Sequence, residues 1–219
     1  DILSKSQAID NLCLADCTRL STINLTHGNL KYLNLSKCTS ITSFSAVRMP
    51  LVETILLPFC RNVNKVSVEK IVTYSPHLKY LNIGGCINIK SLHLKNGKHL
   101  KTLSLGMCDK LTELRVESCP KLITMPVGLC INLKNIYIYK CPLIQSLNVS
   151  LLKYIELIHI ENCPLIEMID VTSTLKAPPT VVIIPQQQMT FIKDECARLA
   201  DGDSPGANGM GTGMSIMNV

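Results

Sequence analysis

The sequence predicts a solenoid of parallel β-strands, wound in right-handed coils of about 22 residues, with little helix and a C-terminal cap. Three observations predict it. A nine-residue motif recurs along the chain, each motif alternates apolar and polar residues at its centre, and cysteines return at an even spacing. In one stretch they are Cys108, Cys119, Cys130 and Cys141, eleven residues apart. Such periodicity is typical of architectures in which each unit buries its apolar side against the next.

The motif is Φ-x-x-Φ-x-Φ-x-x-C, where Φ is an apolar residue. Along the chain it reads LKYLNLSKC (30–38), VETILLPFC (52–60), LKYLNIGGC (78–86), LKTLSLGMC (100–108), LTELRVESC (111–119), LITMPVGLC (122–130), LKNIYIYKC (133–141) and IELIHIENC (155–163). The central Φ-x-Φ has the period of a strand, so its apolar residues should point inward. Asn, Gly and Pro between motifs mark turns, and two motifs make one coil. The rhythm breaks twice, with a one-residue shortening near Gly28 and a four-residue insertion near IVTYSPH (71–77).

The cysteine of each motif is expected at an inward corner, where a compact and weakly polar side chain fits a tight bend. This structural ladder comprises Cys38, Cys60, Cys86, Cys108, Cys119, Cys130, Cys141 and Cys163. Where cysteine is missing, another small or apolar residue such as Leu152 holds its place. Zinc sites use paired ligands such as C-x-x-C, and none occurs, so we expect no metal and no cofactor.

The total of eleven cysteines is odd, which would leave one thiol unpaired in a secreted domain. We therefore expect reduced thiols and a cytoplasmic location. Disulfides between stacked coils would form only under oxidation and are not expected to be structural.

The composition suits thin, repetitive layers. Hydrophobic residues make up 47% of the 219 residues and charged ones 17%, whereas aromatics reach only 4% and tryptophan is absent. The net charge is +6, but the lysines are scattered and form no basic stripe, which argues against nucleic-acid binding. No apolar run approaches the ~18 residues of a membrane span. We expect a monomer that does not cross a membrane.

Several motifs resemble a known family. LKYLNLSKCTSIT and LKYLNIGGCINIKSL look like leucine-rich repeats, closest to the cysteine-containing subclass L-x-x-L-x-L-x-x-C-x-x-I/L. LKTLSLGMCDKLTEL is also similar to the irregular repeats of plant disease-resistance receptors. The resemblance covers about residues 9–174.

The resemblance implies a leucine-rich-repeat solenoid of the α/β superfamily that serves as a protein-binding scaffold, as in ubiquitin-ligase adaptors, innate receptors and bacterial effectors. This chain departs from the family in two ways. Cysteine replaces the usual asparagine of the ladder, and the second half of each coil repeats the strand motif where the family has a helix. No F-box or nucleotide-binding domain is visible in the sequence, so none of these specific roles carries over.

Alternation assigns outward residues to two faces. At the centre of the second face it places Asn24, Ser45, Ser67, His93, Arg115, Tyr137 and His159, with Lys95, Glu113, Glu117, Tyr139 and Glu161 as neighbours. Tyr and Arg dominate many protein interfaces. The candidate partner-binding residues are therefore His93, Arg115, Tyr137, Tyr139 and His159. The alternative interpretation is a solvated sheet face without a partner.

The outward residues of the first face are mostly small and uncharged. Its central outward residues are Asn34, Leu56, Asn82, Ser104, Pro126 and Asn148. Tyr32, Asn34, Tyr80 and Asn82 form the alternative binding face. The asparagine column could equally be a ladder of side-chain amides that binds nothing.

The rhythm ends near residue 176, so we assign residues 1–176 to the solenoid. Residues 177–200 are expected to form a capping strand (VVIIP, 181–185) and a short helix (189–200), in which Thr190 is the N-cap and Phe191, Ile192, Cys196 and Leu199 have helical spacing. A partner-docking helix is the alternative. Residues 201–219 are rich in Gly, Asn, Asp and Ser and are expected to form a flexible tail.

No catalytic constellation is visible. The ladder cysteines should face inward, His93 and His99 have no adjacent nucleophile, and the acidic residues are single and dispersed. The sequence thus predicts a non-enzymatic scaffold that binds an unidentified partner protein through one face. One alternative is a bacterial effector or ubiquitin-ligase-type adaptor, which as an effector would act in a host cytosol. Another is a carbohydrate-binding or carbohydrate-cleaving β-solenoid.

Overall fold

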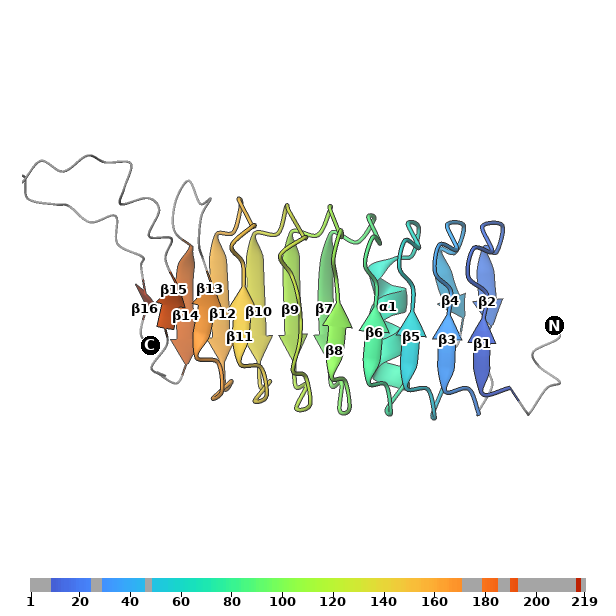
Figure 1. The fold of residues 1–219 in the computed structure, drawn as a ribbon, viewed down its shortest axis with the longest axis horizontal. Helices are drawn as coiled ribbons and strands as arrows, with labels where there is room; N and C mark the ends of the chain where they lie inside the picture. Colours follow the sequence, from blue (N-terminus) through green and yellow to red (C-terminus); the bar gives the residue numbers. More distant parts are fainter. Residues whose placement is uncertain are drawn as a thin grey trace, which may run out of the picture.

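The computed structural model describes residues 9–24, 29–45, 49–170, 179–184, 190–192 and 216–217. It is a β-solenoid of about seven turns with about 22 residues per turn. In Figure 1 the near strands point up and the far strands point down while the chain advances from right to left. This is the sense of a right-handed coil, as predicted.

Every strand pair is parallel, and the strands form two opposite faces. The first face holds a five-stranded sheet of β1 (Asn11–Cys13), β3 (Tyr32–Asn34), β5 (Thr54–Leu56), β6 (Tyr80–Asn82) and β8 (Thr102–Ser104), and a three-stranded sheet of β11 (Ser146–Asn148), β13 (Met168–Asp170) and β15 (Thr190–Ile192). The second face holds the pair β2 (Thr22–Asn24) and β4 (Ser43–Ser45), and a six-stranded sheet of β7 (Ser91–Lys95), β9 (Glu113–Glu117), β10 (Asn135–Tyr139), β12 (Leu157–Glu161), β14 (Thr180–Ile184) and β16 (Ile216–Met217).

The register of the first face confirms both irregularities read from the sequence. Tyr32 pairs with Thr54, 22 residues further on, which is the regular period. Asn11 pairs with Tyr32, one residue short of that period. Thr54 pairs with Tyr80, four residues beyond it, so the insertion lies in this coil.

The inserted coil contains the helix α1 (Lys65–Tyr74) on the second face, where a strand was expected. The placement of Ser67 as an outward strand residue is wrong, because Ser67 lies in this helix and is only 4% exposed. The Asn64 side chain caps the helix by accepting a hydrogen bond from the Ser67 backbone N–H at 2.9 Å. A helix rises about 1.5 Å per residue and a strand about 3.3 Å, so a helix needs extra residues to span one side of a coil.

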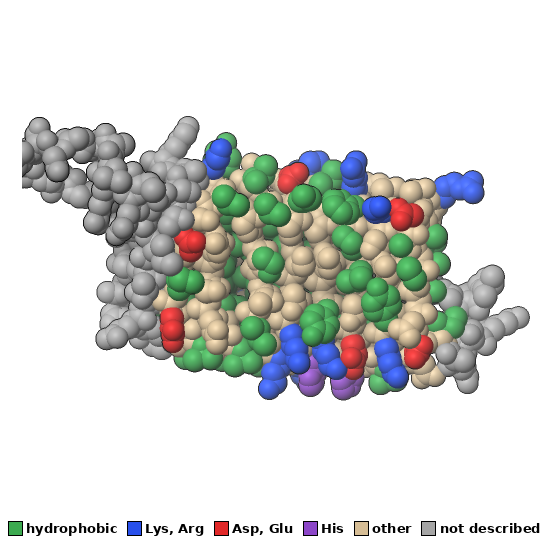
Figure 2. Space-filling view, in the orientation of Figure 1, with side chains coloured by type: hydrophobic (Ala, Val, Ile, Leu, Met, Phe, Trp, Pro, Cys, Tyr) green, Lys and Arg blue, Asp and Glu red, His purple; other side chains and the backbone are tan. Residues whose placement is uncertain are grey.

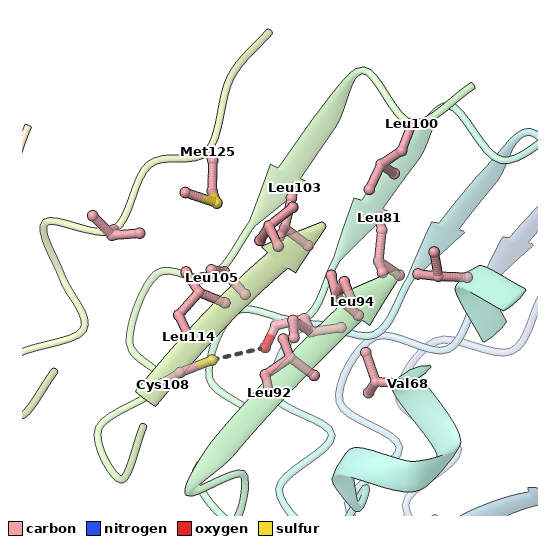
Figure 3. Close-up of a cluster of buried hydrophobic side chains, with 14 of the residues drawn as sticks. Val68, Leu81, Leu92, Leu94, Leu100, Leu103, Leu105, Cys108, Leu114 and Met125 are labelled. Carbon is pink, nitrogen blue, oxygen red and sulfur yellow. Dashed lines mark hydrogen bonds between the residues drawn. The ribbon is translucent and has the colours of Figure 1, made fainter. Parts of the chain in front are cut away.

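The core is a continuous column of aliphatic side chains and cysteines between the two faces. Figure 3 shows part of it, with Leu81 and Leu103 from first-face strands and Leu92, Leu94 and Leu114 from the second face. All eight predicted ladder cysteines are buried, none more than 2% exposed, so the inward orientation is confirmed. Leu152, in the place of a cysteine, is also fully buried.

Each corner cysteine follows a residue with left-handed backbone, except Cys130. These residues are Lys37, Phe59, Gly85, Met107, Ser118, Lys140 and Asn162. The backbone N–H of Lys37 donates to the Pro58 carbonyl at 2.8 Å, and that of Phe59 donates to the Gly84 carbonyl at 2.7 Å. Bonds of this kind tie corners of successive coils together and offset the cost of a conformation that non-glycine residues rarely adopt.

Strand stacking continues beyond residue 176. A strand is present where a capping strand was expected at 181–185: it is β14, which pairs in register with β12 on one side and with β16 on the other. The prediction of a helix at 189–200 is wrong for Thr190–Ile192, the part of this range that the structure describes. These residues form β15 and pair with β13. Cys196, Leu199 and most of the expected tail lie outside the described residues, although Ile216–Met217 form β16 beside β14.

Candidate functional site

The strands β7, β9, β10 and β12 bring all five predicted partner-binding residues together on the second face. Register places His93, Arg115, Tyr137 and His159 in one row across four neighbouring strands. A second row contains Lys95, Glu117, Tyr139 and Glu161. We call the following residues the second-face patch: His93, Lys95, Arg115, Glu117, Tyr137, Tyr139 and His159.

Strand alternation fixes the outward direction of the patch side chains. Each of these strands has five residues, and the second and fourth are buried, as with Ile136 and Ile138 in β10. The side chains between them must therefore point outward. The backbone under the patch is fixed by parallel pairing on both sides of β9, β10 and β12.

One end of the patch is ionic and centres on Glu117. Its Oε2 lies 3.1 Å from Lys95 Nζ, 3.3 Å from His93 Nε2 and 4.0 Å from Arg115 Nε. Burial acts to raise the pKa of Glu117, but the hydrogen bonds from Lys95 and His93 outweigh it and hold that pKa below its usual value. Glu117 is thus an ionised acceptor at neutral pH that holds three basic side chains together.

The other end of the patch is aromatic. The Arg115 guanidinium carbon lies 4.7 Å from the ring centroid of Tyr139 and 5.7 Å from that of Tyr137, within the range of a cation–π contact. The two tyrosine rings are nearly parallel, 14° apart, with centroids separated by 6.3 Å. The His159 ring completes the group, 5.2 Å from Tyr139. Burial raises the pKa of Tyr139, although the charge of Arg115 opposes this, so the phenol stays neutral.

Two polar atoms of the patch have no hydrogen-bond partner within the described part of the chain. They are Arg115 Nε and His159 Nε2, and both atoms are buried. Buried polar atoms are usually hydrogen-bonded, so these two are exceptions within the described part of the chain.

The helix α1 borders the patch at the edge of β7. Glu69 Oε1 accepts a hydrogen bond from the His93 backbone N–H at 2.9 Å, and Lys65 Nζ contacts Ser91 Oγ at 3.3 Å. The helix therefore covers the strand edge that β4 would otherwise meet. Asn24 and Ser45, predicted for the same face, lie in β2 and β4, but their side chains are outside the described part of the structure.

The four residues of the alternative binding face do not form one cluster. Tyr32 and Asn34 lie on β3, whereas Tyr80 and Asn82 lie on β6, and β5 separates the two strands. The asparagines do not form an amide ladder with each other. Asn34 Oδ1 accepts from the Ser36 backbone N–H, and Asn82 Oδ1 accepts from the Gly84 N–H, both at 2.9 Å. These are local turns that follow the strand ends.

The first face also has a hollow of about 510 Å³ that sequence reasoning missed. Pro126, Gly128, Leu129 and Asn148 contribute to its lining. It lies where the five-stranded and three-stranded sheets of this face are interrupted, with only a single bridge between Thr102 and Thr124. Proline lacks the N–H that a strand donates to its neighbour, so Pro126 was the signal that could have located the interruption.

The surface of the first face is otherwise mixed. Figure 2 shows charged side chains along its upper and lower margins, and mainly hydrophobic and uncharged polar groups between them. His77 and His99 stack on neighbouring coils, with centroids 5.4 Å apart.

The described residues contain no group of three or more His, Cys, Asp or Glu side chains placed to hold a metal ion. Within the same ranges, no helix has the length and apolarity needed to cross a membrane. Cys13 and Cys17, which stand outside the predicted ladder, are exposed.

The chain matches no protein-family model, and no curated protein gives a significant match to it.

Proposed function

We propose that this protein is a non-enzymatic scaffold of the leucine-rich-repeat type that binds a partner protein through the second-face patch. The observation that carries the proposal is the clustering of Arg115, Tyr137, Tyr139 and His159 on rigid parallel strands. Arg and Tyr supply much of the binding energy in protein interfaces when they are preorganised.

The contacts inside the patch support preorganisation. The Arg115 side chain rests over both tyrosine rings and is held near Glu117, so little rotamer freedom remains to be lost on binding. Arg115 is still 41% exposed, and its Nε has no hydrogen-bond partner among the described residues. A partner carboxylate or carbonyl would be bound by the exposed part of the Arg115 guanidinium.

We also propose an oligomeric state, a location and a cap for this scaffold. It would act as a monomer in the cytoplasm, or in a host cytosol as an effector, and the last strands, β15 on the first face and β16 on the second, would close the apolar end of the stack as a cap.

The test is affinity capture from a lysate of cells that naturally contain the protein, followed by mass spectrometry. Three forms of the protein are compared: wild type, a patch variant and a matched control. The patch variant is Arg115→Thr with Tyr137→Thr, because threonine keeps strand propensity. The matched control is Lys153→Thr with Tyr154→Thr, which removes the same kinds of exposed side chain from a turn away from the patch. Thermal unfolding confirms first that all three forms fold alike.

A protein captured by wild type and control, but lost at least tenfold from the patch variant, supports the proposal. Equal capture by all three forms would contradict the assignment to the second face. If only glycans or polysaccharides bind, the scaffold proposal fails in favour of a carbohydrate-acting solenoid.

A further inference from the structure

Exposed hydrophobic residues gather on the edge of the stack where first-face strands pass to second-face strands. Three successive corners follow β8, the Thr124 bridge and β11, and each corner leads to a strand of the second face. These corners carry five large hydrophobic residues that are 50–55% exposed, and we call them the corner ridge. They are Met107, Leu129, Ile131, Leu151 and Tyr154.

The repeat makes the corner ridge continuous. Met107, Leu129 and Leu151 follow one another at intervals of 22 residues, so they hold the same position on three neighbouring coils, which are about 4.8 Å apart. A Cβ added to Gly106 would lie 3.6 Å from Leu129 Cδ1, so the Leu129 side chain reaches the coil of Met107. Single exposed hydrophobic residues are normal, whereas a contiguous group of them marks an interaction surface.

The corner ridge stands between two hollows. The first-face hollow of about 510 Å³ has Leu129 and Leu151 in its lining. A second hollow, of about 520 Å³, lies toward the second face and is lined in part by Tyr154 and Lys110. The hydrophobic side chains of the ridge therefore project from the edge instead of lying flush with a face.

Basic residues flank the corner ridge. The described corners between first-face and second-face elements hold seven basic residues against three acidic ones. The basic residues are Arg19, Lys37, Arg61, Lys90, Lys110, Lys134 and Lys153, and the acidic residues are Asp16, Asp109 and Glu156. Among the described residues, Lys90, Lys110 and Lys153 take part in no ion pair. Figure 2 shows hydrophobic groups beside Lys and Arg side chains along this edge, at the upper margin of the molecule.

The size and the charge of this surface favour a membrane over a second protein. Five half-exposed side chains offer on the order of 500 Å², whereas a stable protein interface buries about 800 Å² on each partner. A projecting apolar edge can instead enter the boundary between lipid headgroups and acyl chains, where it needs no matching concave partner. Lysine suits such a site because its stem lies along apolar groups while its ammonium stays at the headgroups, and tyrosine is enriched at the same depth.

We propose that the corner ridge docks this protein on a membrane surface that contains anionic lipids. Met107, Leu129 and Leu151 enter the headgroup region, and Lys110 and Lys153 contact the lipid phosphate and carboxylate groups around them. The solenoid axis then lies along the membrane, and both sheet faces stand away from it. The second-face patch stays accessible, so this inference does not depend on what that patch binds.

The opposite edge, where second-face strands return to the first face, has no such ridge among the described residues. Its exposed hydrophobic residues include Leu51, Ile123 and Leu165, which precede β5, the Thr124 bridge and β13. These three coils do not neighbour one another, so the side chains form no continuous row. Ile123 is 49% exposed, nearly the same as Leu129, and therefore provides a matched control position.

The first experiment uses the absence of tryptophan from the chain. Leu129→Trp and Ile123→Trp each place a single fluorescent reporter on one edge of the full chain. Each variant is mixed with vesicles of phosphatidylcholine alone or of phosphatidylcholine with phosphatidylserine, and with the same lipids brominated on their acyl chains. We expect a blue shift and bromine quenching of the Leu129→Trp emission with anionic vesicles, and neither change for Ile123→Trp.

The second experiment separates the corner ridge from the second-face patch. Lys153→Thr with Tyr154→Thr removes one charge beside the ridge and one ring from it, whereas Arg115→Thr with Tyr137→Thr leaves the ridge intact. In vesicle sedimentation we expect the Lys153 and Tyr154 variant to partition at least about tenfold less than wild type onto anionic vesicles. The Arg115 and Tyr137 variant should stay within about twofold of wild type, and added salt should weaken the binding of both.

Failure of the wild-type chain to partition onto anionic vesicles would overturn the proposal. Equal quenching of the two tryptophan variants would also overturn it, as would equal partition of the two threonine variants once thermal unfolding has shown that both are folded. Light scattering tests the remaining occupant, a second copy of this chain. A doubled mass without lipid, abolished by Lys153→Thr with Tyr154→Thr, would assign the ridge to a dimer and refute membrane docking.

Discussion

Cys60 shows what a corner cysteine does for the fold. Its thiol donates to the Leu35 carbonyl at 2.9 Å, which adds a second hydrogen bond to an oxygen that also accepts from the Cys38 backbone N–H at 3.1 Å. Serine could donate in the same way but would bring a more polar oxygen into an apolar column, and alanine would leave the carbonyl without this donor. Cysteine combines compact size with a weak donor, which suits the position.

Replacing such a thiol by a charge should be severe. We predict that Cys60→Asp lowers the free energy of unfolding by more than about 3 kcal/mol, because it buries a carboxylate with no cation nearby. Cys13→Asp, at an exposed cysteine, should cost less than about 0.5 kcal/mol. Urea unfolding monitored by circular dichroism measures both, and equal stability of the two variants would contradict the inward ladder.

The sequence predicts the inward direction of these cysteines but not their hydrogen-bond acceptors. Direction follows from the period-2 pattern and is the same in every coil. The acceptor differs between the faces: Cys60 reaches the Leu35 carbonyl of the preceding coil at 2.9 Å, whereas Cys141 lies closest to the Tyr139 carbonyl two residues before it, at 3.3 Å. Nothing in the nine-residue motif distinguishes these two cases.

At the scale of elements, the second-face patch was predictable as a set because the 22-residue period continues without a break from β7 to β12. Equal spacing carries His93, Arg115, Tyr137 and His159 into one row. Side-chain conformations were not predictable in this way. The convergence of three basic groups on Glu117 depends on rotamers that spacing does not specify.

The helix α1 was missed although its signals were present. Asn64 is a good N-cap, and the buried Val68, Ile71 and Val72 follow the i, i+3, i+4 spacing of a helix face. The repeat made a strand the expected element there, and the insertion was interpreted only as a break in the repeat. Extra length within a repeat should instead be tested for a helix, since helix geometry requires more residues for the same span.

The contact between α1 and β7 gives a prediction for this element. Glu69→Ala should lower the free energy of unfolding by about 1–2 kcal/mol, because the His93 N–H loses its acceptor at the sheet edge. Glu69→Gln keeps a carbonyl acceptor and should stay within about 0.5 kcal/mol of wild type. Urea unfolding gives the energies, and amide exchange at His93 reports the bond directly. Identical effects of alanine and glutamine would show that Glu69 does not protect this edge.

At the scale of the whole molecule, the sheets differ in extent along the axis. Among the described residues near the N-terminal end, the second face has the pair β2 and β4 alone, whereas β9, β10 and β12 are five-residue strands paired on both sides. Because each coil of a solenoid contacts mainly its neighbours, stability is a sum of local terms and can vary along the chain.

Hydrogen exchange should reveal this gradient. We predict that amides of β9, β10 and β12 exchange at least about tenfold more slowly than those of β2 and β4, which corresponds to about 1.4 kcal/mol of local opening free energy. Exchange followed by mass spectrometry on the intact, reduced chain provides the comparison. A uniform rate across both sets would instead indicate one cooperative unit.

Because β9, β10 and β12 match residue for residue, the number of coils sets the length of the molecule along its axis. A duplicated coil of 22 residues would keep every neighbour relation and lengthen the stack by about 4.8 Å. A single added residue within a strand would turn the apolar side outward from that point. Length along the axis can therefore change in fixed steps while the pattern displayed on each face is preserved.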